Sequence, residues 1–156
     1  MSKKFQFASA GSVSTGTMRS QDLIESFSSE LRFLGHRSKE LTRIEKRYNT
    51  AINGEFGEDD EYFNNEVSSF DLESLVNMLD SHCLPYFYFG SHPGDGADYG
   101  FWISESIEYD YDGLKVSDTS EVKDSYIGEV LHVNDHGNMT LYTAKKGKLT
   151  EVWSVV

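Results

Sequence analysis

Nine acidic side chains in the middle of the chain have the residue type and spacing of a binding surface. They form two runs, one over residues 55–61 and one over residues 105–112. Carboxylates at this density attract Lys- and Arg-rich surfaces, and charge complementarity raises association rates by roughly 10- to 10³-fold. The predicted partner-binding residues are Glu55, Glu58, Asp59, Asp60, Glu61, Glu105, Glu108, Asp110 and Asp112. The aromatic residues interleaved with them are expected to anchor the dry part of such an interface: Tyr62, Phe63, Tyr109 and Tyr111.

The charge of the chain is concentrated in its middle. The 156 residues include 14 Lys and Arg against 26 Asp and Glu, a net charge of −12. Residues 1–50 carry a net charge of +4, residues 51–125 carry −16, and residues 126–156 are neutral. This balance argues against direct binding of nucleic acid, which needs cations to displace counterions from phosphates, and against docking on anionic lipid. A plainer interpretation is a solubilising surface, or one that the cations of segment 38–53 neutralise internally.

A second candidate site lies in the segment YFYFGSHPGDGADYGFW, residues 86–102, where four glycines and a proline indicate a tight loop over 90–98. His92, Asp95 and Asp98 are three residues apart, and imidazole and carboxylate ligands suit a divalent ion. A catalytic metal site usually has at least three protein ligands, and no further ligand is evident. Asp and Gly also satisfy turn geometry. We therefore predict a hairpin turn, with a ligand-binding loop as the alternative, and we expect no metal ion and no cofactor.

Other catalytic patterns fit the sequence poorly. Asp110-Tyr-Asp112-Gly resembles the start of a calcium loop, but Thr119 stands where the bidentate Glu is needed. If the segment is a strand instead, Glu108, Asp110 and Asp112 point to one face. Cys83 at the predicted end of a helix is typical of a core position, and no nucleophile elbow or phosphate-binding loop is present. We predict no catalytic residue and a protein that is not an enzyme.

The elements that position these residues change in period near residue 84. Apolar residues recur at helical spacing over 20–34, 38–53 and 70–82, with Ser20, Ser38 and Ser68 or Ser69 as caps. Alternation then predicts strands at 86–89, 99–103, 114–117, 126–133, 139–143 and 149–155, and a short strand is expected at 4–8. Helices followed by strands predict an α+β fold, in which N-terminal helices pack on one face of an antiparallel β-sheet with a C-terminal meander.

The chain is expected to form a single domain, residues 1–156. In this domain residues 1–18 form an extended lead-in, 19–83 are mainly helical and 84–156 are mainly antiparallel strands. One cysteine excludes a disulfide scaffold and favours a reducing compartment. No apolar stretch is long enough for a secretory signal or a membrane span. The sequence therefore predicts a cytoplasmic protein that does not bind membranes.

Two motifs carry a resemblance to known proteins. STGTMRSQDLI at residues 14–24 and YFGSHPGDGADYGFW at residues 88–102 resemble a group of small, acidic, largely uncharacterised proteins encoded by bacteriophages and plasmids. The resemblance implies an inhibitor of host defence, of the anti-CRISPR or antirestriction type, acting in the host cell cytoplasm. Some such inhibitors mimic nucleic acid, presenting carboxylates where a nuclease expects phosphates. No catalytic residue carries over from that group.

Three functions remain open from the sequence. The first is a non-enzymatic acidic inhibitor that occupies the nucleic-acid-binding site of a basic host protein, such as a nuclease or a Cas-type effector. The second is a small-molecule, nucleotide or metal-binding protein that uses the 90–98 loop. The third is an immunity protein that neutralises a toxin.

Overall fold

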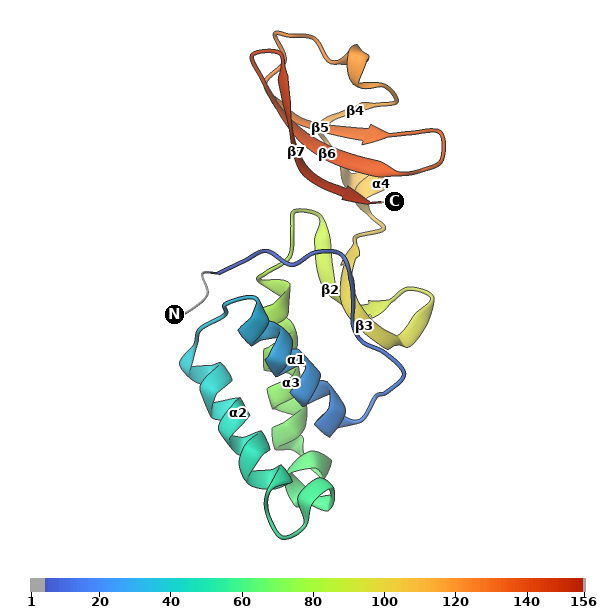
Figure 1. Cartoon of the computed structure of the whole chain (residues 1–156). Helices are drawn as coiled ribbons and strands as arrows, with labels where there is room; N and C mark the ends of the chain where they lie inside the picture. Colours follow the sequence, from blue (N-terminus) through green and yellow to red (C-terminus); the bar gives the residue numbers. More distant parts are fainter. Residues whose placement is uncertain (1–4, 156) are drawn as a thin grey trace. The chain divides into compact units, whose positions relative to one another are not determined.

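The computed structural model describes residues 5–155 and has the predicted α+β fold. The chain divides into two compact units between Ser104 and Glu105, which we call the N-terminal and C-terminal units (Figure 1). Whether the two units fold together as the expected single domain stays a prediction. No helix among residues 5–155 is long and apolar enough to span a membrane.

Three helices form the N-terminal unit together with a small sheet. They are α1 (Ser20–Phe33), α2 (Lys39–Ile52) and α3 (Glu66–Asp80). α1 packs against α3, and the sheet lies against both (Figure 1). The predicted apolar stripes point into the core, where the largest fully buried aliphatic side chains are Ile24, Leu31, Leu41, Ile44, Leu75 and Leu79. The helical period therefore placed the core correctly.

The helix ends show which local signals are effective. The predicted Ser20 cap was wrong, because Ser20 is the first residue of α1 and Arg19 precedes it without a side-chain cap bond. Ser38 Oγ accepts a hydrogen bond from the Leu41 amide at 3.1 Å, the predicted cap of α2. Gly35 follows α1 with a φ of 74°, which a residue with a Cβ would adopt at a cost. The predicted start of α3 was wrong, because Asn65 Oδ1 caps Val67 N at 2.9 Å and the helix begins at Glu66.

The N-terminal sheet contains β1 (Gly11–Ser14), β2 (Phe87–His92) and β3 (Asp95–Ile103) in the antiparallel order β1-β3-β2. The predicted loop over 90–98 is almost entirely strand, and only Pro93 and Gly94 lie between β2 and β3. Phe89 and Phe101 are buried in the core, where the Phe89 ring packs on both Phe27 and Phe101.

Residues 5–8 form no strand, contrary to expectation, and Lys4 lies outside the described residues. The backbone of this segment bonds to helix ends instead of a sheet: Gln6 N donates to Leu34 O, and Ala8 N donates to His82 O, both at 2.9 Å. Carbonyls that the C-terminal turns of α1 and α3 leave unpaired are thereby satisfied.

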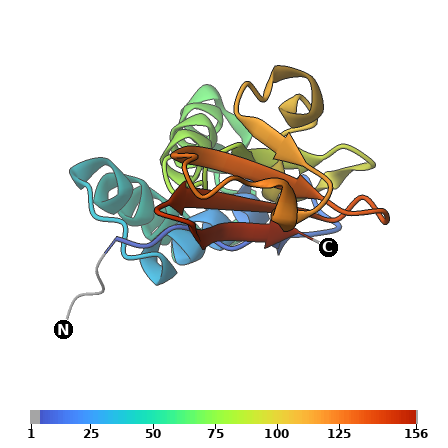
Figure 2. The ribbon, with the colours of Figure 1, turned by 90° about the horizontal axis from the view of Figure 1, so that it is seen from above.

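The C-terminal unit contains β4 (Leu114–Val116), β5 (Gly128–Val133), β6 (Met139–Lys145) and β7 (Lys148–Val155) in that spatial order. β5, β6 and β7 form the predicted antiparallel meander and lie side by side (Figure 2). The fully antiparallel expectation was wrong for β4, which pairs with β5 in parallel. A parallel pair needs a crossover, and the segment between the two strands supplies it with a short 3₁₀ turn, Thr119–Glu121.

Candidate functional site: acidic segments and a basic pocket

The first predicted acidic run, residues 55–61, follows α2 and is called the acidic segment below. Its backbone forms the 3₁₀ turn Gly57–Asp59, and its last residue begins a second 3₁₀ turn, Glu61–Asn64. Asp60 joins them, and its Oδ1 accepts a hydrogen bond from Tyr62 N at 2.9 Å. The side chains of Tyr62 and Phe63 are buried directly after it, so the segment is attached to the core at one end.

Four of the five carboxylates of the acidic segment are exposed to solvent. Glu55, Glu58, Asp59 and Glu61 are exposed, and Asp60 is half-buried. Within residues 5–155, Glu58 is the one member with an ion pair, its Oε2 lying 3.3 Å from Nη2 of Arg19. Both side chains of this pair are exposed, so it contributes at most about 1 kcal/mol. Within residues 5–155, no cation of α2 forms an ion pair with the acidic segment.

The second acidic run, residues 105–112, belongs to the C-terminal unit. The segment is neither a strand nor a calcium loop: it forms the short helix α4 (Ile107–Asp110), which buries Ile107. All four of its predicted partner-binding residues are exposed: Glu105, Glu108, Asp110 and Asp112. Because the two runs lie on different units, each must be considered as a separate surface.

The expected aromatic anchors are mostly internal. Tyr62 and Phe63 are buried and Tyr111 is half-buried, so only Tyr109 is exposed as predicted. Phe56 was not predicted as an anchor, yet it lies inside the acidic segment and is 65% exposed. Its position directly after Glu55 was the available signal.

His92 and Asp95 bond to backbone amides of the hairpin, whereas Asp98 has no such bond among the described atoms. His92 Nδ1 accepts a hydrogen bond from Gly94 N at 2.9 Å, and Asp95 Oδ1 accepts one from Ala97 N at 3.0 Å. Asp98 Oδ1 is buried without a hydrogen-bond partner among the described atoms. No group of three or more His, Cys, Asp or Glu side chains within residues 5–155 is arranged to hold a metal ion. Binding of another ligand by this hairpin stays a prediction.

One glycine of the hairpin, Gly100, makes room for an indole. Gly90 and Gly100 are direct partners across β2 and β3, and Trp102 Nε1 donates to Gly90 O at 3.0 Å. A Cβ on Gly100 would lie 2.8 Å from the Trp102 ring and 2.3 Å from Gly11 O in β1. The conspicuous composition of this motif therefore has a packing explanation.

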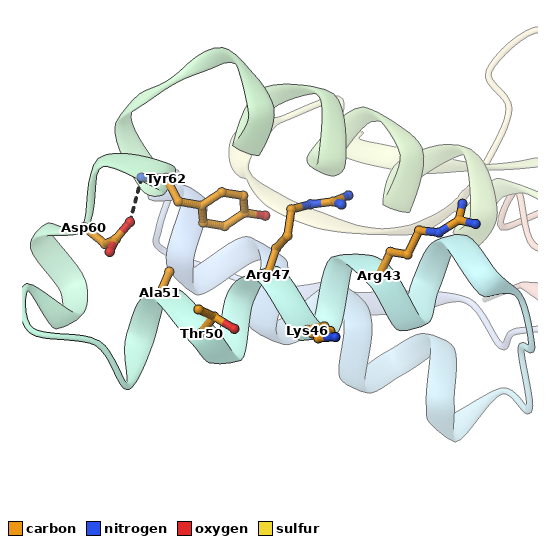
Figure 3. A pocket seen from close by; sticks show the side chains of 7 residues that line it. All are labelled: Arg43, Lys46, Arg47, Thr50, Ala51, Asp60 and Tyr62. Atoms are coloured by element: carbon orange, nitrogen blue, oxygen red, sulfur yellow. Dashed lines mark hydrogen bonds between the residues drawn. The ribbon is translucent and has the colours of Figure 1, made fainter.

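A basic pocket of about 370 Å³ lies beside α2 and was not predicted. Arg43, Lys46, Arg47 and Thr50 line it from one face of the helix, since residues three and four apart are neighbours on a helix surface. Ala51, Asp60 and Tyr62 complete the lining. Figure 3 shows Arg43 and Arg47 extending to the same side of α2, with the Tyr62 ring directed toward Arg47.

A buried carboxylate fixes one wall of this pocket. Asp71 of α3 is 5% exposed and pairs with Arg47, whose Nε and Nη2 donate to its two oxygens at 2.8 and 2.7 Å. The Tyr62 hydroxyl donates to Asp71 Oδ2 at 2.7 Å. Burial, followed by the hydrogen bond to Asp71, raises the pKa of Tyr62, so its hydroxyl stays a donor. The hydrogen bond to Asp71 raises the pKa of Arg47.

A pair of histidines lies in the segments that follow α1 and α3. His82 is fully buried, with Nδ1 2.6 Å from Gln6 O and Nε2 2.9 Å from Nδ1 of His36. Because a carbonyl oxygen only accepts, we assign the His82 proton to Nδ1, and His36 Nδ1 then donates to His82 Nε2. Nε2 of His36 is left as a buried acceptor without a described partner.

This pair predicts a loss of stability in mild acid. Burial, then the nearby His82 and Arg32, lowers the pKa of His36, whereas burial raises the pKa of Glu30 on α1. As the pH falls below about 6.5, the unfolded chain binds the His36 proton first, so folding stability decreases by up to about 1.4 kcal/mol per pH unit. The raised pKa of Glu30 acts in the opposite direction at lower pH.

Urea unfolding of the wild type and of His36→Gln between pH 7.5 and 5.5 measures this effect. The wild type is expected to lose more stability than the variant over that interval. Equal losses would show that the pair does not couple protonation to folding.

Cys83 is a poor nucleophile in this environment. Burial, then the neighbouring Asp80 carboxylate, raises the pKa of its thiol to about 12, so almost none is thiolate at neutral pH.

No protein-family model matches this chain, and comparisons with curated proteins and with solved structures also give no match. The resemblance of its two motifs to proteins of mobile elements therefore stays an expectation.

Proposed function

We propose that this protein is a non-enzymatic inhibitor whose acidic segment occupies a basic, nucleic-acid-binding site of a partner protein. The observation that carries the proposal is the state of the five carboxylates in residues 55–61. Four are exposed, and within residues 5–155 only Glu58 has an ion pair, with an exposed arginine. Unneutralised charge on a segment attached to the core is the requirement for electrostatic docking.

The density of charge supports a nucleic-acid-like surface. Residues 58–61 are four consecutive acids. The backbone rises about 2 Å per residue in a 3₁₀ turn and about 3.3 Å in an extended stretch, so the segment carries about one carboxylate for every 2–3 Å of backbone, with successive side chains of a turn pointing to different sides. Duplex DNA carries one charge per roughly 1.7 Å of its axis. A channel lined with Lys and Arg that accepts phosphates can therefore accept this segment.

An exposed aromatic side chain supplies the apolar part of the contact. Phe56 is next to Glu55 and is 65% exposed. Buried aromatic anchors carry much of the binding energy of protein interfaces, while surrounding charges set orientation and association rate. The motif resemblance suggests a host nuclease as the partner, and the C-terminal acidic run provides a separate, weaker candidate surface.

Protection of DNA from cleavage tests the proposal. Plasmid DNA is incubated with purified restriction endonucleases and RNA-guided nucleases, with and without this protein. We expect inhibition of at least one nuclease, and at least tenfold weaker inhibition by Glu55→Lys/Glu61→Lys, because two attractive contacts become repulsive.

The matched control is Asp135→Lys/Glu151→Lys, which changes net charge equally at exposed positions in the C-terminal unit. It is expected to inhibit as the wild type does. Equal inhibition by all three proteins would contradict a role for the acidic segment.

A further inference from the structure

The outer face of the hairpin formed by β2 and β3 carries an indole and a carboxylate that the proposed function does not use (Figure 1). The inner face is identified by Phe101, which is 1% exposed, and by Tyr99, whose ring packs on Phe27 in the core. Successive side chains of a strand point to opposite faces, so Asp98 and Trp102 lie on the outer face. None of these residues belongs to the acidic segment.

The indole of Trp102 is held against the sheet. Its Nε1 donates to Gly90 O at 3.0 Å, and the His92 ring lies 4.7 Å away at 86° to the indole plane. The indole extends along the strand over Gly100, because a Cβ built there would lie 2.8 Å from Trp102 Cζ2. The Trp102 side chain is half-buried, so part of the ring is accessible in a fixed position.

The carboxylate of Asp98 lacks a partner close to this ring. Asp98 stands two residues before Gly100 on the same face, about 7 Å along the strand. Its Oδ1 is buried without a hydrogen-bond partner among the described atoms, and no ion pair within residues 5–155 includes Asp98. A carboxylate oxygen that has lost water without gaining a donor is stabilised by a nearby cation. The sequence has no Lys or Arg between Arg47 and Lys115, so neither strand of the hairpin supplies one.

An arginine side chain would satisfy both groups at once. The face of a Trp ring attracts cations, and the planar guanidinium also stacks on aromatic faces. The N–H donors of a stacked guanidinium lie in its own plane, where a carboxylate beside the ring can accept them. The ammonium of lysine is a compact, strongly hydrated point charge, which fits this combination less well.

From these features we propose that the outer face of the hairpin is a docking site for an arginine side chain of a partner protein. The guanidinium stacks on Trp102 and donates to Asp98. The indole lies against the sheet and covers a ligand from one side only, so the occupant is a segment of a partner that extends over the hairpin.

NMR titration with the peptide acetyl-Gly-Arg-Gly-amide, and with analogues that carry citrulline or lysine in place of arginine, tests this assignment. We expect the arginine peptide to shift the Trp102 indole N–H and the Ala97 amide. Each analogue should bind about fivefold or more weakly, because citrulline lacks the charge and lysine lacks the planar donors. Equal affinity of either analogue, or shifts confined to residues 55–61, would overturn the proposal.

Asp98→Asn is expected to weaken the arginine peptide by about fivefold or more. Its free energy of unfolding should equal or exceed that of the wild type, because a partly buried charge without a partner is removed. Urea unfolding measures this second effect, which separates a lost contact from a damaged fold.

The matched control is Asp95→Asn, which removes the same charge from an exposed residue of the same hairpin. Its amide oxygen can still accept from Ala97 N, so this variant should bind the arginine peptide as the wild type does. Equal affinity of the two variants would contradict a docking site at Asp98. Nuclease inhibition is a separate readout, and Glu55→Lys/Glu61→Lys should leave binding at Trp102 unchanged.

Discussion

Replacing Arg47 by methionine is expected to lower the free energy of unfolding by about 3 kcal/mol at neutral pH. The variant removes both charged donors of the Asp71 carboxylate, which is 5% exposed. The Tyr62 hydroxyl, which already donates to Asp71 in the wild type, is left. Removing one partner of a buried pair costs about 3–5 kcal/mol. The lower value applies here because the Arg47 side chain is 41% exposed and part of its charge is already hydrated.

Equilibrium urea unfolding measures this cost, and two comparisons identify its cause. In Arg47→Met/Asp71→Asn no buried charge is left, so most of the lost stability should return. The deficit of the single variant should also shrink toward pH 4, because burial raises the pKa of an unpaired carboxyl and lets it become neutral. A double variant no more stable than Arg47→Met would refute the buried-charge explanation.

The second large effect is expected at Gly100, where substitution by alanine should destabilise the protein by about 3 kcal/mol. The new methyl group would lie 2.3 Å from Gly11 O and 2.9 Å from Gly11 C, both backbone atoms of β1. Overpacking costs about 1–3 kcal/mol, and the upper value applies because a strand cannot yield as a side-chain end can.

Gly96→Ala is the matched control in the same strand. A Cβ at Gly96 meets no atom within 4 Å, so a change of no more than about 0.5 kcal/mol is expected. Urea unfolding followed by tryptophan fluorescence compares the two variants. If both have wild-type stability, β1 does not approach β3 at Gly100 as closely as the structure indicates.

Sequence patterns located the elements wherever a single segment carries the signal. The stripe Leu23, Ile24, Phe27 and Leu31 defined α1, and Ser38 defined the start of α2, because periodicity and capping are local. The same reasoning misplaced the start of α3, since Ser68 and Asn65 are both good caps, and only the packing of the first turn buries Ser68.

The hairpin was predicted, but its loop was placed over 90–98 and not at Pro93 and Gly94, because composition conceals the packing role of the glycines. Gly90 and Gly100 look like turn residues, yet they lie within strands, where Gly100 leaves space for Trp102 and Gly90 lies against the Tyr88 ring. β1 also approaches Gly100 closely, at Gly11, which is about 90 residues away in the sequence. The parallel pairing of β4 was missed for a similar reason, since a three-residue strand does not indicate its direction.

The basic pocket depends on contacts that sequence spacing does not show. Arg47 and Asp71 are 24 residues apart and meet only when α2 packs near α3. One signal was available: Asp71 stands three residues after Ser68 and four before Leu75, on the buried stripe of α3. A charged residue on a buried stripe requires a buried partner, and the cations of α2 were the candidates.

The exposure of the acidic side chains was predicted correctly for most of them. Their grouping into one surface was not. Eight of the nine are exposed, which follows from the cost of burying charge. Their division between two units could not be read from a continuous run of negative charge. The proposed function therefore rests on residues 55–61 alone.

The dependence of affinity on salt, measured for the nuclease that this protein inhibits, is the most direct test of the acidic segment. Fluorescence anisotropy gives Kd from about 50 to 200 mM salt, where phosphate-like contacts lose affinity steeply. If the acidic segment docks as proposed, log K falls linearly with log salt, the slope is shallower for Glu55→Lys/Glu61→Lys, and duplex DNA displaces the protein. A Kd that is constant with salt, identical in the variant and insensitive to DNA would contradict it.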